Sequence, residues 1–211
     1  MPILSYILTA LAAYLLGSIP TGYLAAKAKG IDIRTVGSGN IGATNAMRVL
    51  GKPIGITVLL VDALKGFAAV CLPVWLQTAF NISADDLETH RVIAGIGAVL
   101  GHNYTCWLKF KGGKGIATSA GVFLALAPLA MGVSVAVFAV TLLLTRYVSI
   151  GSIAAAAALP VAVWFTRESL LLRIVTIALG SLAIYKHKSN IRRLRDGTEN
   201  RIGNKKKETQ K

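Results

Sequence analysis

Residues 115–145 read GIATSAGVFLALAPLAMGVSVAVFAVTLLLT and contain no charged side chain. A helix needs about 20 mostly apolar residues to cross a hydrocarbon core of roughly 30 Å, so this run is long enough to span a bilayer. Pro128 lies near its middle, where a proline produces either a kink in one long helix or a turn between two helices. The stretch therefore predicts membrane-spanning helix and leaves the number of crossings open.

Apolar segments of comparable length lie on both sides of this run. Only 15% of the 211 residues are charged, whereas soluble domains carry about 25%. We therefore predict an all-α, polytopic integral membrane protein, with one membrane domain at residues 1–190 and a basic cytoplasmic tail at 191–211. The seven expected helices cover residues 3–25, 54–77, 91–108, 115–127, 129–145, 148–166 and 169–185.

Positive charge is gathered in alternate loops, although the formal net charge of +14 alone would suggest a nucleic-acid partner. Most lysines and arginines follow the first, third and seventh apolar segments, and the positive-inside rule assigns those loops to the cytoplasm. This places the N-terminus outside and the C-terminus inside if the helices number seven, or five if two weak segments do not cross. We expect membrane lipid, and no nucleic acid, as the surroundings.

The first basic loop, residues 30–51, is rich in small polar residues. Glycines let backbone N–H groups converge on an anion, Ser, Thr and Asn add neutral donors, and Arg can grip a phosphate with two hydrogen bonds. We favour an anion site over a tight re-entrant turn, for which glycine alone would suffice. The candidate residues are Gly37, Ser38, Gly39, Asn40, Thr44, Asn45 and Arg48.

Two further stretches carry candidate site residues. Gly112, Gly113 and Lys114 precede a predicted helix, and a helix N-terminus with a nearby lysine suits a phosphate. His187 and Asn190 are three residues apart and share a face if they lie on a helix. A solvated interfacial histidine is the alternative for His187.

Charged residues inside a predicted helix need a partner or a polar surrounding. Asp62 and Lys65 lie three residues apart in the second segment, and we favour a structural ion pair over a role with substrate. His102, near the end of the third segment, is expected to orient the second loop. The sequence contains no metal-ligand cluster and no Ser or Cys nucleophile motif, so we predict neither metal nor cofactor.

The three polar stretches resemble motifs of the bacterial acyl-phosphate:glycerol-3-phosphate acyltransferases, the PlsY family. The resemblance runs from GSIPTGYL (17–24) through GSGNIGATNAMR and GHNYTCWLKFKGGKGIAT to HKSNIRRLRDGTE, and it covers essentially the whole chain. It implies an inner-membrane enzyme, expected to be a monomer. The enzyme would transfer an acyl group from acyl phosphate to the 1-hydroxyl of sn-glycerol 3-phosphate, the first acylation of bacterial phospholipid synthesis. Its expected catalytic residues are Ser38, Lys114, His187 and Asn190, with Arg48 binding phosphate.

An enzyme of this kind requires the three stretches to lie close together in the folded chain and form one site. Acyl phosphate is already activated, so direct attack by the glycerol hydroxyl is expected, with either the donor phosphate or His187 accepting the proton. A transporter for organic phosphate is the main alternative. Transporter sites usually lie near the bilayer midplane between inverted repeats, whereas the polar residues here gather at one interface. A lipid-binding scaffold is the second alternative.

Overall fold

The computed structural model describes residues 2–78, 81–166 and 168–203, and every regular element in that part of the chain is a helix. The predicted all-α fold class is therefore confirmed. The α-helices are α1 (Pro2–Ser18), α2 (Thr21–Lys27), α3 (Ala43–Leu50), α4 (Lys52–Trp75), α5 (Ala84–Asn103), α6 (Ile116–Leu126), α7 (Pro128–Thr145), α8 (Val148–Phe165), α9 (Leu170–Lys186) and α10 (Lys188–Arg195).

The helix at the third apolar segment differs from the prediction of 91–108. It begins at Ala84, because Ser83 caps it by accepting a hydrogen bond from the Asp86 amide (3.1 Å), and Asp85 and Asp86 lie in its first turn. It ends at Asn103, after which the chain turns through a short 3₁₀ helix, Cys106–Leu108. The prediction missed the first turns of this helix because they contain charged residues, and a search for apolar segments assigns charged residues to loops.

Several helices are long and apolar enough to cross a membrane. Within the described residues there are four such spans, namely Ile3–Lys27, α4, α7 and α8, and a fifth if α9 and α10, which meet at 51°, form one broken span. Many large apolar side chains face outward, among them Leu143 and Phe165, each 79% exposed. The chain is thus a multi-pass membrane protein, and seven crossings remain a prediction.

Small residues let the helices approach one another closely, as is usual in membranes. A Cβ built on Gly17 of α1 would lie 2.1 Å from the Ala98 carbonyl oxygen of α5, and one on Gly101 would lie 2.2 Å from the Tyr14 oxygen. Gly121 of α6 meets the Ala63 carbonyl of α4 in the same way. Because α4 also packs on α5, these contacts make α1, α4, α5 and α6 one packed group.

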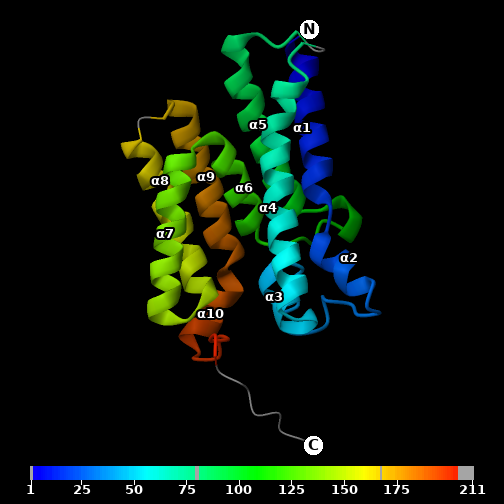
Figure 1. Cartoon of the computed structure of the whole chain (residues 1–211), viewed down its shortest axis with the longest axis vertical. Coiled ribbons are helices and arrows are strands. Elements are labelled where there is room, and N and C mark those ends of the chain that lie inside the picture. Colours follow the sequence, from blue (N-terminus) through cyan, green and yellow to red (C-terminus); the bar gives the residue numbers. More distant parts are fainter. Residues whose placement is uncertain (1, 79–80, 167, 204–211) are drawn as a thin grey trace, which may run out of the picture.

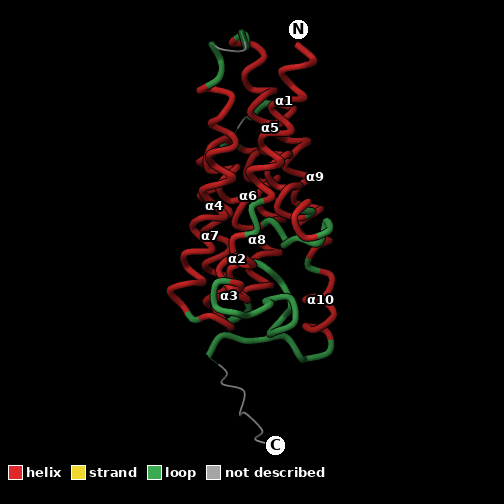
Figure 2. The backbone as a smooth tube through the Cα atoms, turned by 90° about the vertical axis from the view of Figure 1, so that its right-hand side faces the viewer, coloured by secondary structure: helices red, strands yellow, loops and turns green. Residues whose placement is uncertain are grey.

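Helices α7, α8 and α9 form a second group, and α6 lies on the side of the first group that faces it, where it contacts α7 (Figure 1). The short helices α2, α3 and α10 all gather at one end of the molecule, opposite the start of α1 (Figure 1). Figure 2 shows α3 and α10 at that same end, among the longer loops. The polar stretches predicted from the sequence lie on or beside these short helices.

Candidate active site

A cavity of about 530 Å³ lies where the first loop, the start of α6 and helix α10 meet. Its wall contains residues from all three predicted stretches, although these lie far apart in the chain. The three predicted stretches therefore meet around one cavity. The predicted site residues that line the cavity are Ser38, Asn40, Thr44, Asn45, Arg48, Asp62, His102, Lys114, His187 and Asn190.

Five predicted site residues, among the part of the chain that is described, do not line this cavity: Gly37, Gly39, Gly112, Gly113 and Lys65. Three of the glycines already use their backbone N–H groups. Gly39 donates to the Val36 carbonyl (3.0 Å), Gly112 to that of Asn103 (3.2 Å) and Gly113 to that of His102 (3.0 Å).

These glycines instead allow close packing. A Cβ on Gly113 would lie 2.1 Å from Nε2 of His102, and one on Gly112 would lie 2.1 Å from the His102 carbonyl oxygen. Gly37 and Gly39 have φ angles of 63° and 69°, in the left-handed region that favours glycine. The second loop therefore rests directly on His102, and the first loop turns tightly at two points.

Asn45 is the organising residue of the first loop. Its buried side chain donates from Nδ2 to the carbonyls of Asn40 (2.9 Å), Val36 (3.1 Å) and Ile33 (3.3 Å), and its Oδ1 accepts from the Ser38 amide (2.8 Å). The amide thus holds both sides of the loop together. Ser38 and Arg48 line the cavity from this loop and the helix that follows it.

A chain of polar contacts joins the second loop to α10. Lys114 Nζ donates to Oδ1 of Asn190, and Nδ2 of Asn190 donates to Oε1 of Glu199 (2.8 Å). Glu199 also accepts from Nε of Arg193 (2.6 Å) and from the Ser149 hydroxyl at the start of α8 (3.1 Å). Lys114 and Asn190, predicted from separate motifs, are therefore in direct contact.

His187 lies at the break between α9 and α10 and is 3% exposed. Its Nδ1 lies 2.7 Å from the Ala183 carbonyl oxygen. A carbonyl only accepts, so Nδ1 carries the proton and Nε2 is left as an acceptor. Burial, with a smaller contribution from the charge of Lys114, lowers the pKa of His187 to about 4. The ring is neutral at pH 7.

The cavity carries an excess of positive charge. Five cationic side chains line it (Arg48, Lys52, Lys114, Arg193 and Arg201), against the two carboxylates of Asp62 and Glu199. Burial, followed by the charge of Arg193, lowers the pKa of Lys114 to about 8. Burial also raises the pKa of Glu199, but the hydrogen bonds from Asn190 and Arg193 outweigh it and lower that pKa. Such a site attracts anions.

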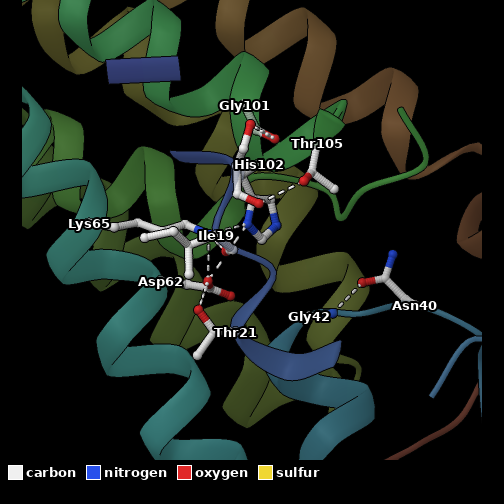
Figure 3. A network of polar contacts seen from close by, with 10 residues as sticks. Ile19, Thr21, Asn40, Gly42, Asp62, Lys65, Gly101, His102 and Thr105 are labelled. Carbon is white, nitrogen blue, oxygen red and sulfur yellow. Dashed lines mark hydrogen bonds and ion pairs between the residues drawn. The ribbon is translucent and has the colours of Figure 1, made fainter. Parts of the chain in front are cut away.

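The predicted ion pair inside α4 is present. Lys65 Nζ lies 2.8 Å from Oδ1 of Asp62, and both side chains are at most 4% exposed. Thr21 of α2 donates to the same oxygen (3.0 Å), and Lys65 also contacts the Ile19 carbonyl and His102 (Figure 3). The pair thus connects α4 to the break between α1 and α2 and to the end of α5.

Some residues of the site were missed from the sequence. Glu199 and Arg201 lie in the predicted tail, Lys52 lies between the first basic loop and the second apolar segment, and Ser149 lies at the start of a predicted helix; none was given a role. The signal for Glu199 was present, since it is a carboxylate that follows a glycine turn within a strongly basic stretch. The last basic residues of the tail, 204–211, lie outside the described residues.

Comparisons with known proteins show the family of this chain. Residues 7–197 match a family model described as glycerol-3-phosphate acyltransferase. Proteins of that name from Geotalea daltonii and Geobacter metallireducens are 49% and 51% identical to this chain, each over 93% of it and 97% of their own length.

Two solved structures of a glycerol 3-phosphate acyltransferase also resemble this chain. The crystal structure of PlsY, an integral membrane glycerol 3-phosphate acyltransferase, in its glycerol 3-phosphate form matches with a TM-score of 0.85 and 40% identity over 94% of this chain and 96% of that one. A lysophosphatidic acid form matches with a TM-score of 0.82 and 39% identity over the same shares. The chain belongs to the glycerol-3-phosphate acyltransferase family.

Proposed function

We propose that this membrane glycerol-3-phosphate acyltransferase takes its acyl group from an acyl phosphate and transfers it to the 1-hydroxyl of sn-glycerol 3-phosphate. The products are 1-acyl-sn-glycerol 3-phosphate and inorganic phosphate. The observation that carries the proposal is the single cavity in which cationic side chains from three distant stretches surround a space large enough for two phosphate groups. Both substrates are phosphates, and both need cations.

The lining of the cavity also suits a donor with a long acyl chain. Leu59 of α4, Phe138 of α7 and Ile116 of α6 form an apolar part of the wall. Leu59 is 44% exposed and belongs to α4, one of the helices long and apolar enough to cross a membrane. The phosphate end of the donor would lie among the cations while its chain passes these residues toward the bilayer.

In the reaction we propose, Arg48 and Lys114 hold phosphate groups, and Ser38 donates from the first loop. The acceptor 1-oxygen attacks the acyl carbon, the bond from that carbon to the bridging phosphate oxygen breaks, and the hydroxyl proton passes to the departing phosphate. Neutral His187, through Nε2, accepts a hydrogen bond from the hydroxyl and orients it. A pKa of about 4 makes His187 a poor final acceptor of the proton, which favours the donor phosphate.

We assign a shaping role to the other predicted residues. Asn45 holds the first loop, and the amides of Gly39, Gly112 and Gly113 bind protein carbonyls. Asn190 fixes Lys114 while it is itself held by Glu199. Charge patterning supports seven crossings, with the cavity facing the cytoplasm from the inner membrane and the N-terminus outside. We propose that the chain acts as a monomer.

The test compares donors. The purified protein in detergent, with glycerol 3-phosphate, should form 1-acylglycerol 3-phosphate from acyl phosphate and none from acyl-CoA or acyl carrier protein. Lys114→Met is the matched control, because it keeps the chain length and removes the charge. Turnover with acyl-CoA but not with acyl phosphate would contradict the proposal. Uptake of glycerol 3-phosphate into vesicles, without any acylation, would instead support the transporter.

A further inference from the structure

The ammonium group of Lys65 fixes the protonation pattern of a second histidine in the cavity wall. Its Nζ has three acceptors within 3.1 Å, which are the Ile19 carbonyl (2.8 Å), Oδ1 of Asp62 (2.8 Å) and Nδ1 of His102 (3.1 Å). A lysine has three protons and no acceptor, so Nδ1 of His102 must accept. The proton of the neutral imidazole therefore resides on Nε2.

The Nε2 atom of His102 lies against Gly113 of the second loop, and His102 is one of the residues that line the cavity. In Figure 3 its second ring nitrogen lies on the side of the ring away from Lys65. Lys114 directly follows Gly113 in the chain. No hydrogen-bond partner is observed for Nε2 among the described residues, nor is it one of the fully buried unpaired atoms.

The neighbourhood of Nε2 suits a phosphate oxygen. Gly115, Ile116 and Ala117 line the same cavity at the start of α6. The first backbone hydrogen bond of α6 runs from the Ser119 amide to the Gly115 carbonyl (2.7 Å), so the amides of Ile116, Ala117 and Thr118 are the free donors of the helix N-terminus. Lys114 adds a full positive charge. The buried imidazole would complete this set with a donor that cannot rotate.

We propose that His102 is a further substrate-binding residue, whose Nε2–H, oriented by the Lys65–Asp62 pair, donates a hydrogen bond to a phosphate oxygen of the substrate bound beside Lys114. The inference rests on the proposed function and adds to it a residue that the structure would otherwise assign only to packing. Lys65 and Asp62 are positioning residues in this arrangement, since they act through His102.

Two replacements of His102 separate the substrate role from a packing role. In His102→Asn, the amide oxygen occupies the place of Nδ1 and still accepts from Lys65, but nothing reaches the place of Nε2. In His102→Gln, the amide nitrogen reaches the place of Nε2 and the Nδ1 acceptor is lost. The proposal predicts that Asn lowers kcat/KM about 10- to 100-fold, the usual effect of losing a hydrogen bond to a charged group, while Gln retains most of it.

A packing role predicts the opposite order, because Asn keeps the contact with Lys65 and Gln breaks it. The KM values identify which phosphate is bound: a higher KM for glycerol 3-phosphate indicates the acceptor, and a higher KM for acyl phosphate indicates the donor. His90→Asn is the matched control. His90 is equally buried but bonds to Asp86 and Ser5 at the other end of α5, so its loss should leave kcat/KM unchanged.

A measurement on the unmodified enzyme keeps the inference testable if either variant fails to fold. The chain has only three histidines, so ¹⁵N-histidine labelling gives three imidazoles for NMR. His102 should show the Nε2–H tautomer, and inorganic phosphate or glycerol 3-phosphate should move its Nε2 proton downfield. A protonated Nδ1, no response to either phosphate, or an Asn variant as active as Gln would overturn the inference. Absence of acyl transfer by the unmodified enzyme would instead refute the proposed function.

Discussion

His102 and His187 border one cavity with opposite hydrogen-bonding character. Nδ1 of His187 donates to the Ala183 carbonyl, so its Nε2 accepts, whereas Nδ1 of His102 accepts from Lys65, so its Nε2 donates. Acyl transfer between phosphates needs both, an acceptor for the attacking hydroxyl and a donor for an anionic oxygen. In each ring a contact on the far side from the reactive nitrogen sets the tautomer.

The role of His187 can be tested with a side chain that accepts a hydrogen bond but not a proton. If Nε2 only orients the hydroxyl, His187→Gln should stay within about tenfold of the unmodified kcat/KM, because its amide oxygen can take over, and His187→Ala should fall further. Steady-state kinetics and calorimetric titration with glycerol 3-phosphate check this. A Gln variant as inactive as Ala, with binding intact, would make His187 the general base.

The depressed pKa of Lys114 predicts how substrate affinity depends on pH. Lys114 is charged below its pKa of about 8 and loses its proton as the pH rises through that value. The second pKa of a phosphate monoester is about 6, so the dianion and the cation coexist between about pH 6.5 and 8. We expect kcat/KM to be flat in this window and to fall above it.

Lys114→Arg is the control for this profile, because a guanidinium stays charged throughout. Its kcat/KM should be lower, since the fork does not reproduce the contact with Asn190, but the fall above pH 8 should disappear. Binding of a dianion also raises the pKa of Lys114, so the fall in kcat should occur at higher pH than the fall in kcat/KM. If kcat/KM falls at the same pH in the unmodified enzyme and in Lys114→Arg, a group other than Lys114 is responsible for the fall.

The sequence predicts local features of this fold well and long-range ones poorly. Apolar length located most helices, and spacing of three residues identified the Asp62–Lys65 pair, because both depend on neighbours in the chain. The start of α5 was missed, since its acidic first turn resembles a loop. The sequence also does not indicate which acceptor each backbone amide of the loops donates its hydrogen bond to. That Gly113 donates to His102 depends on how α5 and α6 pack.

In the candidate site, too, local motifs were predicted from the sequence and long-range contacts were not. Ser38, Lys114 and Asn190 line one cavity, as the motifs led us to expect. Asn45 faces into its own loop, where three carbonyls surround it, and this distinguishes it from the exposed Thr44 only once the loop is folded. Glu199 acquires its role through Ser149, 50 positions away, and no local pattern indicates that contact.

Glu199 is expected to hold the α10 side of the site together. Its side chain is only 7% exposed, and it accepts from Asn190, Arg193 and Ser149. Glu199→Gln removes the charge and turns an amide group toward donors, so we expect a lower melting temperature and a KM for glycerol 3-phosphate raised about tenfold. Exposed Asp196→Asn is the control and should change neither quantity.

Acid should reproduce the effect of that substitution. The pKa of Glu199 is lower in the folded protein than in the unfolded chain, so its contribution to stability is present above the unfolded value, near 4.5, and is lost as the pH falls through the folded value. The difference in melting temperature between the unmodified protein and Glu199→Gln should therefore narrow below about pH 4.5. A difference that stays constant down to pH 3 would show that the charge of Glu199 contributes nothing.

The contact between α4 and α6 offers a test of how packing in the membrane supports the site. A Cβ on Gly121 would lie 1.8 Å from the Ala63 carbonyl oxygen and 2.9 Å from the Phe67 amide nitrogen, and both are backbone atoms. Gly121→Ala therefore forces the two helices apart, at a cost of roughly 1–3 kcal/mol or more. Because α6 begins beside Lys114, the displacement should also raise the KM for phosphate substrates.

Gly132→Ala in α7 is the matched control, since nothing lies within 4 Å of its Cβ. Melting temperatures in detergent and steady-state kinetics should separate the two variants, with Gly132→Ala unchanged or slightly more stable. Equal melting temperatures would mean that this close approach of the helices does not stabilise the fold.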